Sequence, residues 1–154
     1  MGQEEITVNE IDKIEIYSDG SGNTFESDGG YGFVIVQNGK VIDEGSNYIS
    51  SATNNVAELL GAINGLENVK RRRDSGLFNS AEITLVSDSQ LVLGYASGRY
   101  QCKALHLTQL YIRLRQLYQE LNCQQRWVKG HSGDEHNEKC DQLAKAAREG
   151  KGNG

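Results

Sequence analysis

The order of strand-like and helix-like patterns along the chain restricts its fold more than any other feature of the sequence. Three segments with strand character come first, and helical and strand segments alternate after them. This order predicts an α/β fold with a mixed five-stranded sheet, in which the first three strands form an antiparallel meander and helices cover both faces. The expected strands are residues 13–18, 31–37, 40–48, 81–87 and 123–128, and the expected helices are residues 53–69, 89–97, 107–121 and 137–148.

Three short features give further local expectations. Asn38-Gly39 lies between the second and third strands, and this pair readily takes the positive φ angles of a type I′ hairpin turn. The glycine-rich stretch from Asp19 to Gly30 is expected to be a loop, which puts Asp19 at the end of the first strand. Trp127 lies within the last strand, where we expect its ring to be in the core.

Length and composition fit one small domain. A chain of 154 residues can bury one sizeable core. We expect a single domain over residues 12–148, with a disordered or extended tail at 1–11 and a flexible tail at 149–154. No apolar run reaches the roughly 20 residues that cross a bilayer, and the acidic start lacks the features of a secretory signal. The three cysteines have no CxxC spacing, which argues against disulfides and zinc and favours a reducing, cytoplasmic location.

Charge is unevenly distributed along the chain. The formal net charge is −5, which argues against general binding of polyanions. Residues 94–130 nevertheless contain six basic side chains and one acidic side chain, and residues 70–73 form a second basic cluster. Such runs are often solvated helix faces. Beside an acidic pocket they would also hold a nucleic acid strand.

Four acidic residues, far apart in the sequence, are the candidates for chemistry. Taken singly, Asp19 could form a turn, and Glu58 could pair with Asn55 in a capping box. Asp88 could cap a helix, and Asp141 lies in the first turns of one, where a negative charge suits the helix dipole. In a mixed α/β sheet, however, ligand sites gather at strand ends and helix starts, so we expect the four carboxylates to converge. Converging carboxylates need a cation, and oxygen ligands select Mg²⁺ or Mn²⁺.

Six short motifs carry a family resemblance. They are YSDGS (17–21), GGYG (29–32), TNNVAEL (53–59), SDSQ (87–90), WVKGHSG (127–133) and NEKCDQLA (137–144). Over residues 13–148 the chain resembles type 1 ribonuclease H. The resemblance implies a ribonuclease H-like fold and a metal-dependent endonuclease that cuts the RNA strand of an RNA/DNA hybrid, leaving 5′-phosphate and 3′-hydroxyl ends.

The resemblance also implies roles for individual residues. Four carboxylates would be catalytic and would bind two Mg²⁺ ions, for which Mn²⁺ would substitute: Asp19, Glu58, Asp88 and Asp141. His131 would assist proton transfer or product release. Four amide side chains would contact the hybrid, where amides can reach the 2′-hydroxyl groups that distinguish RNA from DNA: Asn23, Asn54, Asn55 and Gln90. Helix capping is the alternative explanation for Asn54 and Asn55.

Two departures from the family's pattern concern substrate binding. Family members with a basic handle carry a lysine- and tryptophan-rich insertion before the leucine-striped helix, whereas this chain has only the short passage from Gly94 to Leu105. It therefore resembles the versions without a handle. Gly22-Asn23-Thr24 also stands where many members have Gly-Asn-Pro, which leaves that loop less rigid. We expect basic side chains to bind the hybrid: Arg99, Lys103, Arg113, Arg115 and the arginines at 71–73.

Two alternative functions are weighed against the hybrid-cutting nuclease. One is another nuclease on the same fold, of the transposase, resolvase or exonuclease type, although these typically arrange their acids differently and lack the KGHSG loop. The other is a catalytically silent nucleic-acid-binding module, which would be expected to have lost at least one of the four acids. For the favoured function we expect an RNA/DNA hybrid as partner, no membrane, no obligatory protein partner and a monomer.

Overall fold

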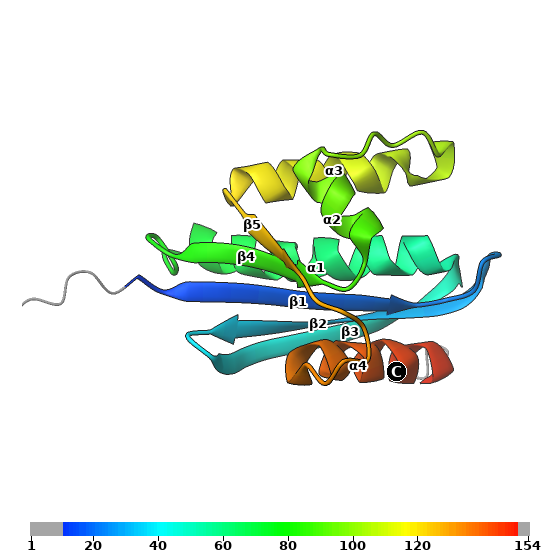
Figure 1. Ribbon diagram of the computed structural model, residues 1–154, viewed down its shortest axis with the longest axis horizontal. Helices are drawn as coiled ribbons and strands as arrows, with labels where there is room; N and C mark the ends of the chain where they lie inside the picture. The colour runs from blue at the N-terminus through cyan, green and yellow to red at the C-terminus, as the bar shows by residue number, and fades with distance from the viewer. Residues whose placement is uncertain (1–10, 151–154) are drawn as a thin grey trace, which may run out of the picture.

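One mixed sheet organises the protein. We describe a computed structural model over residues 11–150, in which the strand order is β3-β2-β1-β4-β5 (Figure 1). β1 pairs antiparallel with β2, and β2 antiparallel with β3, whereas β1, β4 and β5 run parallel. The predicted mixed sheet with an antiparallel meander is confirmed. The strands are β1 (Lys13–Ser21), β2 (Ser27–Gln37), β3 (Lys40–Ala52), β4 (Glu82–Ser87) and β5 (Gln124–Trp127).

Helices cover both faces of this sheet, as predicted. Three of them lie on one face, and α4 lies alone on the other, below the sheet in Figure 1. A short 3-10 helix, η1, precedes α3, and the passage between α2 and α3 contains no other helix or strand. The helices are α1 (Asn54–Asp74), α2 (Gln90–Ser97), η1 (Leu105–Leu107), α3 (Thr108–Glu120) and α4 (Glu135–Gly150).

Alternation along β1 separates two hydrophobic clusters. Ile14 and Ile16 are fully buried in the larger cluster, among side chains from α1, α2 and α3. Tyr17 points to the other face and packs in a smaller cluster with Cys140 of α4. Successive strand residues face opposite sides of a sheet, so Asp19, two residues beyond Tyr17, lies on the side covered by α4.

The hairpin turn has the predicted geometry, but the predicted glycine-rich loop is wrong. Asn38 and Gly39 both have positive φ angles, 51° and 85°. β1 continues to Ser21 and β2 begins at Ser27, so most of 19–30 is strand and Asp19 lies inside β1. The glycines there permit close packing. A Cβ at Gly32, for example, would lie 2.6 Å from the Cβ of Leu143 in α4.

Trp127 is not a core residue, contrary to our expectation. It ends β5, a strand of four residues at the edge of the sheet, and is 49% exposed. An edge strand has a neighbour on one side only, so its last side chain is incompletely covered.

The predicted tails fall mostly outside the described residues. Residues 1–10 and 151–154 are not described, whereas Glu149 and Gly150 belong to α4, which is therefore longer than predicted. The division into two tails and one domain stays a prediction. Within residues 11–150, no helix combines the length and apolar character required to cross a membrane.

Candidate active site

Three of the four predicted metal ligands meet at one place. One carboxylate oxygen from each of Asp19, Glu58 and Asp88 lies within 4.8 Å of the other two. Asp19 comes from β1, Glu58 from the second turn of α1, and Asp88 directly follows β4. These residues are at least 30 positions apart in the sequence, so the fold alone assembles the cluster.

Close packing of α1 on β1 brings Glu58 to Asp19. A Cβ at Gly20 would overlap the main-chain nitrogen of Glu58, so only glycine allows this approach. Gly61, one turn further along α1, is also in close contact with β1, because a Cβ there would be 2.8 Å from the carbonyl oxygen of Asp19. The two glycines thus set the distance between two acidic residues.

Helix capping does not explain Glu58 or Asp88. Thr53 is the N-cap of α1, and its side chain accepts a hydrogen bond from the main-chain N–H of Val56 (3.3 Å). Glu58 therefore lies beyond the position of a capping-box glutamate. Ser89 caps α2 by accepting from Val92 N–H (3.1 Å), so Asp88 is not the cap.

The electrostatics of Asp19 show that the cluster is short of positive charge. Asp19 is 7% exposed, and its burial raises its pKa to about 8, helped by the charges of Asp88, Glu58 and Asp141. A hydrogen bond from the main-chain N–H of Gly20 (2.9 Å) opposes this rise. Without a cation, this carboxyl therefore keeps its proton near neutral pH.

The other two carboxyls of the cluster share this perturbation. Burial raises the pKa of Glu58, and the charge of Asp88 adds to the effect, while hydrogen bonds from Ser89 and Asn54 oppose it. Burial also raises the pKa of Asp88. The side-chain amide of Asn137 donates a hydrogen bond to the Asp88 carboxylate and opposes the rise.

Asp141 lies beside the cluster but outside the group of three. Its charge raises the pKa of both Asp19 and Asp88, which places it within electrostatic reach. Its carboxylate is paired with Lys145, one turn later in α4, at 3.1 Å. The predicted convergence of four acids is thus complete for three of them and partial for Asp141.

The donor set of this cluster fits a divalent cation. Three carboxylates offer the hard oxygen ligands that Mg²⁺ and Mn²⁺ prefer. Within residues 11–150, no lysine or arginine forms an ion pair with Asp19, Glu58 or Asp88. A cation would supply the compensating charge that the protein lacks there.

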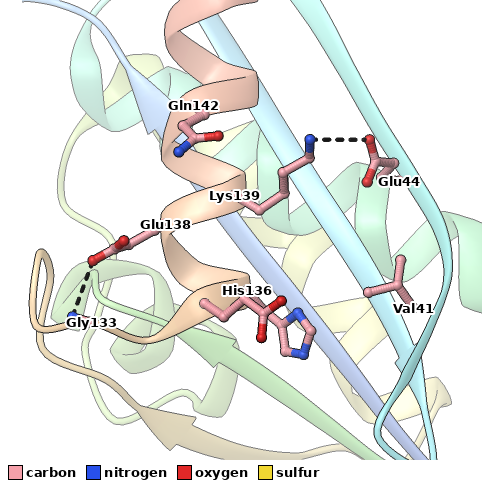
Figure 2. A pocket seen from close by; sticks show the side chains of 8 residues that line it. Val41, Glu44, Gly133, His136, Glu138, Lys139 and Gln142 are labelled. Carbon is pink, nitrogen blue, oxygen red and sulfur yellow. Dashed lines mark hydrogen bonds and ion pairs between the residues drawn. The ribbon is translucent and has the colours of Figure 1, made fainter.

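His131 lies on the loop between β5 and α4, close enough to Asp88 for its charge to lower the pKa of that carboxyl. It is exposed and has a φ of 55°, an uncommon value outside glycine. The loop is tied to α4, because the main-chain N–H of Gly133 donates to Glu138 at 3.1 Å (Figure 2). The hollow of about 530 Å³ drawn in Figure 2, between β3 and α4, contains none of the predicted site residues.

Three of the four predicted substrate residues line one hollow. Asn23, Asn54 and Asn55 surround a space of about 350 Å³, together with His106 of η1, which the sequence analysis did not single out. A hydrogen bond from the main-chain N–H of Asn54 to the carbonyl of Asn23 (2.7 Å) joins its two walls. Gln90, exposed at the start of α2, does not line this hollow.

Several of the basic residues assigned to the hybrid have partners within the protein. Arg113 forms two hydrogen bonds to Glu67, at 2.9 and 3.1 Å, and Arg115 donates to the carbonyl of Ala96 at 3.2 Å. Arg72 is paired with Asp43 at 2.9 Å. Lys103 is exposed and makes no ion pair within the described part of the chain.

Two residues that touch Asp88 were not predicted to do so. The indole N–H of Trp127 donates to the main-chain carbonyl of Asp88 (3.2 Å), in addition to the contact from Asn137. A signal for Asn137 was present in the sequence, since it continues the buried stripe of Cys140 and Ala144 at helical spacing although it is polar. The exposure of Trp127 depended on β5 being an edge strand, which its own residues do not reveal.

Comparison with known proteins identifies the family. The RNase H family model matches residues 12–149. The chain belongs to the RNase H family. It is 35% identical to ribonuclease H of Shewanella denitrificans, over 90% of this chain and 89% of that protein. It is 36% identical to ribonuclease HI of Shewanella oneidensis, over 91% of this chain and 90% of that protein.

Solved structures agree with this assignment. The N-terminal RNase H domain of a Mycobacterium tuberculosis protein matches with a TM-score of 0.77 and 30% identity, over 92% of this chain and 96% of that one. LC11-RNase H1, solved in complex with an RNA/DNA hybrid, matches with a TM-score of 0.76 and 27% identity, over 88% and 96%. The resemblance to type 1 ribonuclease H is thereby confirmed, and this RNase H is an enzyme of the nuclease class.

Proposed function

We propose that this RNase H is a metal-dependent endonuclease that hydrolyses the RNA strand of RNA/DNA hybrids and leaves 5′-phosphate and 3′-hydroxyl ends. The observation that supports it most is the meeting of Asp19, Glu58 and Asp88 within 4.8 Å, with no basic side chain paired to them in residues 11–150. The hybrid bound to LC11-RNase H1 supports the choice of substrate.

The carboxylates would hold two Mg²⁺ ions, or Mn²⁺ in their place, with Asp141 completing the set. Bound divalent cations would supply an activated water and neutralise charge that develops on the scissile phosphate. For the cations to bind, the Asp19 carboxyl must first ionise. Asp19 must lose the proton that its pKa of about 8 otherwise retains, so cation binding releases a proton and becomes stronger as the pH rises.

His131 is proposed to deliver a proton to the departing 3′ oxygen of the RNA. It is exposed at the mouth of the site, and the bond between Gly133 and Glu138 holds its loop against α4. An imidazole exchanges protons near neutral pH, which suits this role. Attack of water on phosphorus breaks the bond between phosphorus and the 3′ oxygen, so the upstream product keeps that oxygen as a 3′-hydroxyl and the downstream product carries a 5′-phosphate.

The hollow lined by Asn23, Asn54 and Asn55 is proposed to bind the hybrid beside the acidic cluster. Asn54 connects the two regions, because its side chain also donates to Glu58. Amide groups and main-chain N–H groups can contact 2′-hydroxyls and base edges without reading sequence. Gln90, exposed at the start of α2, would be a further contact with the hybrid.

The proposal is tested with labelled RNA/DNA hybrid, double-stranded DNA and double-stranded RNA, each with Mg²⁺, Mn²⁺ or EDTA. We expect cleavage of only the RNA strand of the hybrid, abolished by EDTA, with end analysis giving 5′-phosphate products. Cleavage of double-stranded DNA would favour another nuclease on this fold. Binding of hybrid without cleavage would favour a silent binding module. Sedimentation of the same sample checks the expected monomer.

A further inference from the structure

The stretch of chain from the end of β5 to the first turn of α4 approaches Asp88 at three points. The indole N–H of Trp127 donates to the main-chain carbonyl of Asp88 at 3.2 Å. The side-chain amide of Asn137 donates to its carboxylate. Between them, a Cβ at Gly130 would lie 3.0 Å from the Asp88 Oδ2 atom, so the loop passes directly over the carboxylate. Asp88 is therefore held from one side by a single stretch of chain.

Trp127 bonds a main-chain carbonyl that lies beyond the end of the pairing between β4 and β5. Pairing of β4 with β5 ends at Ser87 and Trp127, and the N–H of Val128 bonds the carbonyl of Ser87 at 3.1 Å. The next carbonyl, that of Asp88, lies beyond the ladder and is bonded by the indole. Since Trp127 is 49% exposed, water could satisfy its N–H equally well. The bond instead fixes the main chain of a residue in the acidic cluster.

Asn137 is poorly explained by stability. It is 2% exposed, and its Oδ1 atom has no hydrogen-bond partner among residues 11–150. A buried polar atom left without a partner costs about 1–3 kcal/mol, which offsets the roughly 1.5–3 kcal/mol that one hydrogen bond to a charged group returns. An apolar residue of similar size would avoid this penalty. The contact that Asn137 does make is with the carboxylate of Asp88.

We propose that Trp127 and Asn137 are positioning residues, which hold Asp88 by its main-chain carbonyl and by its carboxylate in the orientation that binds a divalent cation. This inference rests on the proposed metal-dependent function of the cluster. Residues that orient a metal ligand in this way typically change metal affinity by about 10- to 100-fold when they are removed.

The test measures the affinity of the full chain for Mg²⁺ alone, by isothermal titration calorimetry and by the rise in Tm that Mg²⁺ produces. Trp127→Phe removes the indole N–H and retains a ring, and Asn137→Ala removes the amide. We expect each variant to bind Mg²⁺ about tenfold more weakly than the wild type. Asn68→Ala is the matched control, because Asn68 is also buried and hydrogen-bonded, to Asp43 rather than to the cluster.

Unchanged Mg²⁺ affinity in both variants would overturn the proposal. An equal loss in Asn68→Ala would overturn it too, because the effect would then reflect general loosening of the fold. If Asn137→Ala does not fold, Trp127→Phe decides the question, since its half-exposed position tolerates the change. A wild-type protein that binds Mg²⁺ but leaves RNA/DNA hybrid intact would reject the proposed function and would not affect this result.

Discussion

At Asp19, burial and neighbouring charge act in the same direction. The side chain is 7% exposed and shares its surroundings with Glu58, Asp88 and Asp141, so its pKa rises to about 8. In an unfolded chain the same carboxyl ionises near pH 4. Between these two values the folded protein keeps a proton that the unfolded chain has lost. The site therefore opposes folding at neutral pH when no cation is bound.

This difference predicts a pH-dependent effect of Asp19→Asn in EDTA. Because the folded pKa lies above the unfolded pKa, the wild type loses free energy of unfolding as the pH rises from about 4 to about 8. Asparagine does not titrate, so the free energy of unfolding of the variant should gain on that of the wild type across this range, by at most about 6 kcal/mol. Urea unfolding of both proteins at several pH values measures it. A constant difference would show that Asp19 ionises normally.

Asp88→Asn should separate folding from activity. The variant keeps a carbonyl oxygen that can accept the Asn137 hydrogen bond. It also removes a carboxylate whose charge burial disfavours, as the raised pKa of Asp88 shows. We expect a Tm in EDTA equal to or above that of the wild type, and hybrid cleavage reduced by several orders of magnitude. Thermal unfolding and single-turnover cleavage check the two parts. Near-normal cleavage would show that Asp88 is not a metal ligand.

At the level of elements, the distance between α1 and β1 determines whether the site exists. Gly20 lies against the main chain of Glu58, with no space for a Cβ. Any side chain there would push α1 away from β1 and separate Glu58 from Asp19. Packing of α1 against β1 thus sets the distance between two carboxylates of the acidic cluster, in addition to burying apolar surface.

Gly20→Ala should accordingly lower both stability and metal affinity. Overpacking of this kind costs about 1–3 kcal/mol, and the shift of α1 should weaken Mg²⁺ binding as well. Gly150→Ala, at a helical position where a Cβ would contact nothing within 4 Å, is the control and should be close to neutral. Urea unfolding and calorimetry with Mg²⁺ give the two quantities. A stable Gly20→Ala variant with normal affinity would contradict this account of the packing.

The sequence allowed the order and type of the elements to be predicted, but not their contacts. Periodicity located the strands and helices, and Asn38-Gly39 predicted its hairpin turn correctly, because both depend on neighbouring residues. The glycines after Asp19 predict a loop, because glycine is frequent in turns and weakens strands. The close packing of these glycines against α1 and α4 depends on residues far along the chain. The exposure of Trp127 depends likewise on sheet order.

The same limit applies to the candidate site. Family motifs brought Asp19, Glu58 and Asp88 to attention, and the structure assembles them. The pairing of Asp141 with Lys145 follows from helical spacing and could have been predicted. The pairing of Arg113 with Glu67 joins two helices and could not.

Over the whole molecule, net charge is a poor guide to how a polyanion is held. The chain carries −5 overall, and several of its arginines form internal pairs. Lys103, in the passage between α2 and α3, is exposed and forms no ion pair within residues 11–150. Basic side chains that are not paired internally are the ones able to release counterions from a nucleic acid.

Lys103→Gln and Arg113→Gln should therefore differ. We expect Lys103→Gln to weaken hybrid binding and to reduce the slope of log affinity against log salt by about one. Arg113→Gln should leave that slope unchanged and cost within about 1 kcal/mol of stability, since its pair with Glu67 is partly exposed. Fluorescence anisotropy with labelled hybrid in EDTA, over a range of salt, distinguishes them. A reduced slope for Arg113→Gln alone would reverse the assignment.

The position of Trp127 makes the protein its own optical probe. The chain contains one tryptophan, and its indole is bonded to the residue whose carboxylate would bind the cation. Light absorbed beyond the tyrosine band excites this ring alone. Any ligand that excludes water from the ring or shifts Asp88 should therefore change the emission wavelength, so ligand binding at the acidic cluster can be followed in real time without a label.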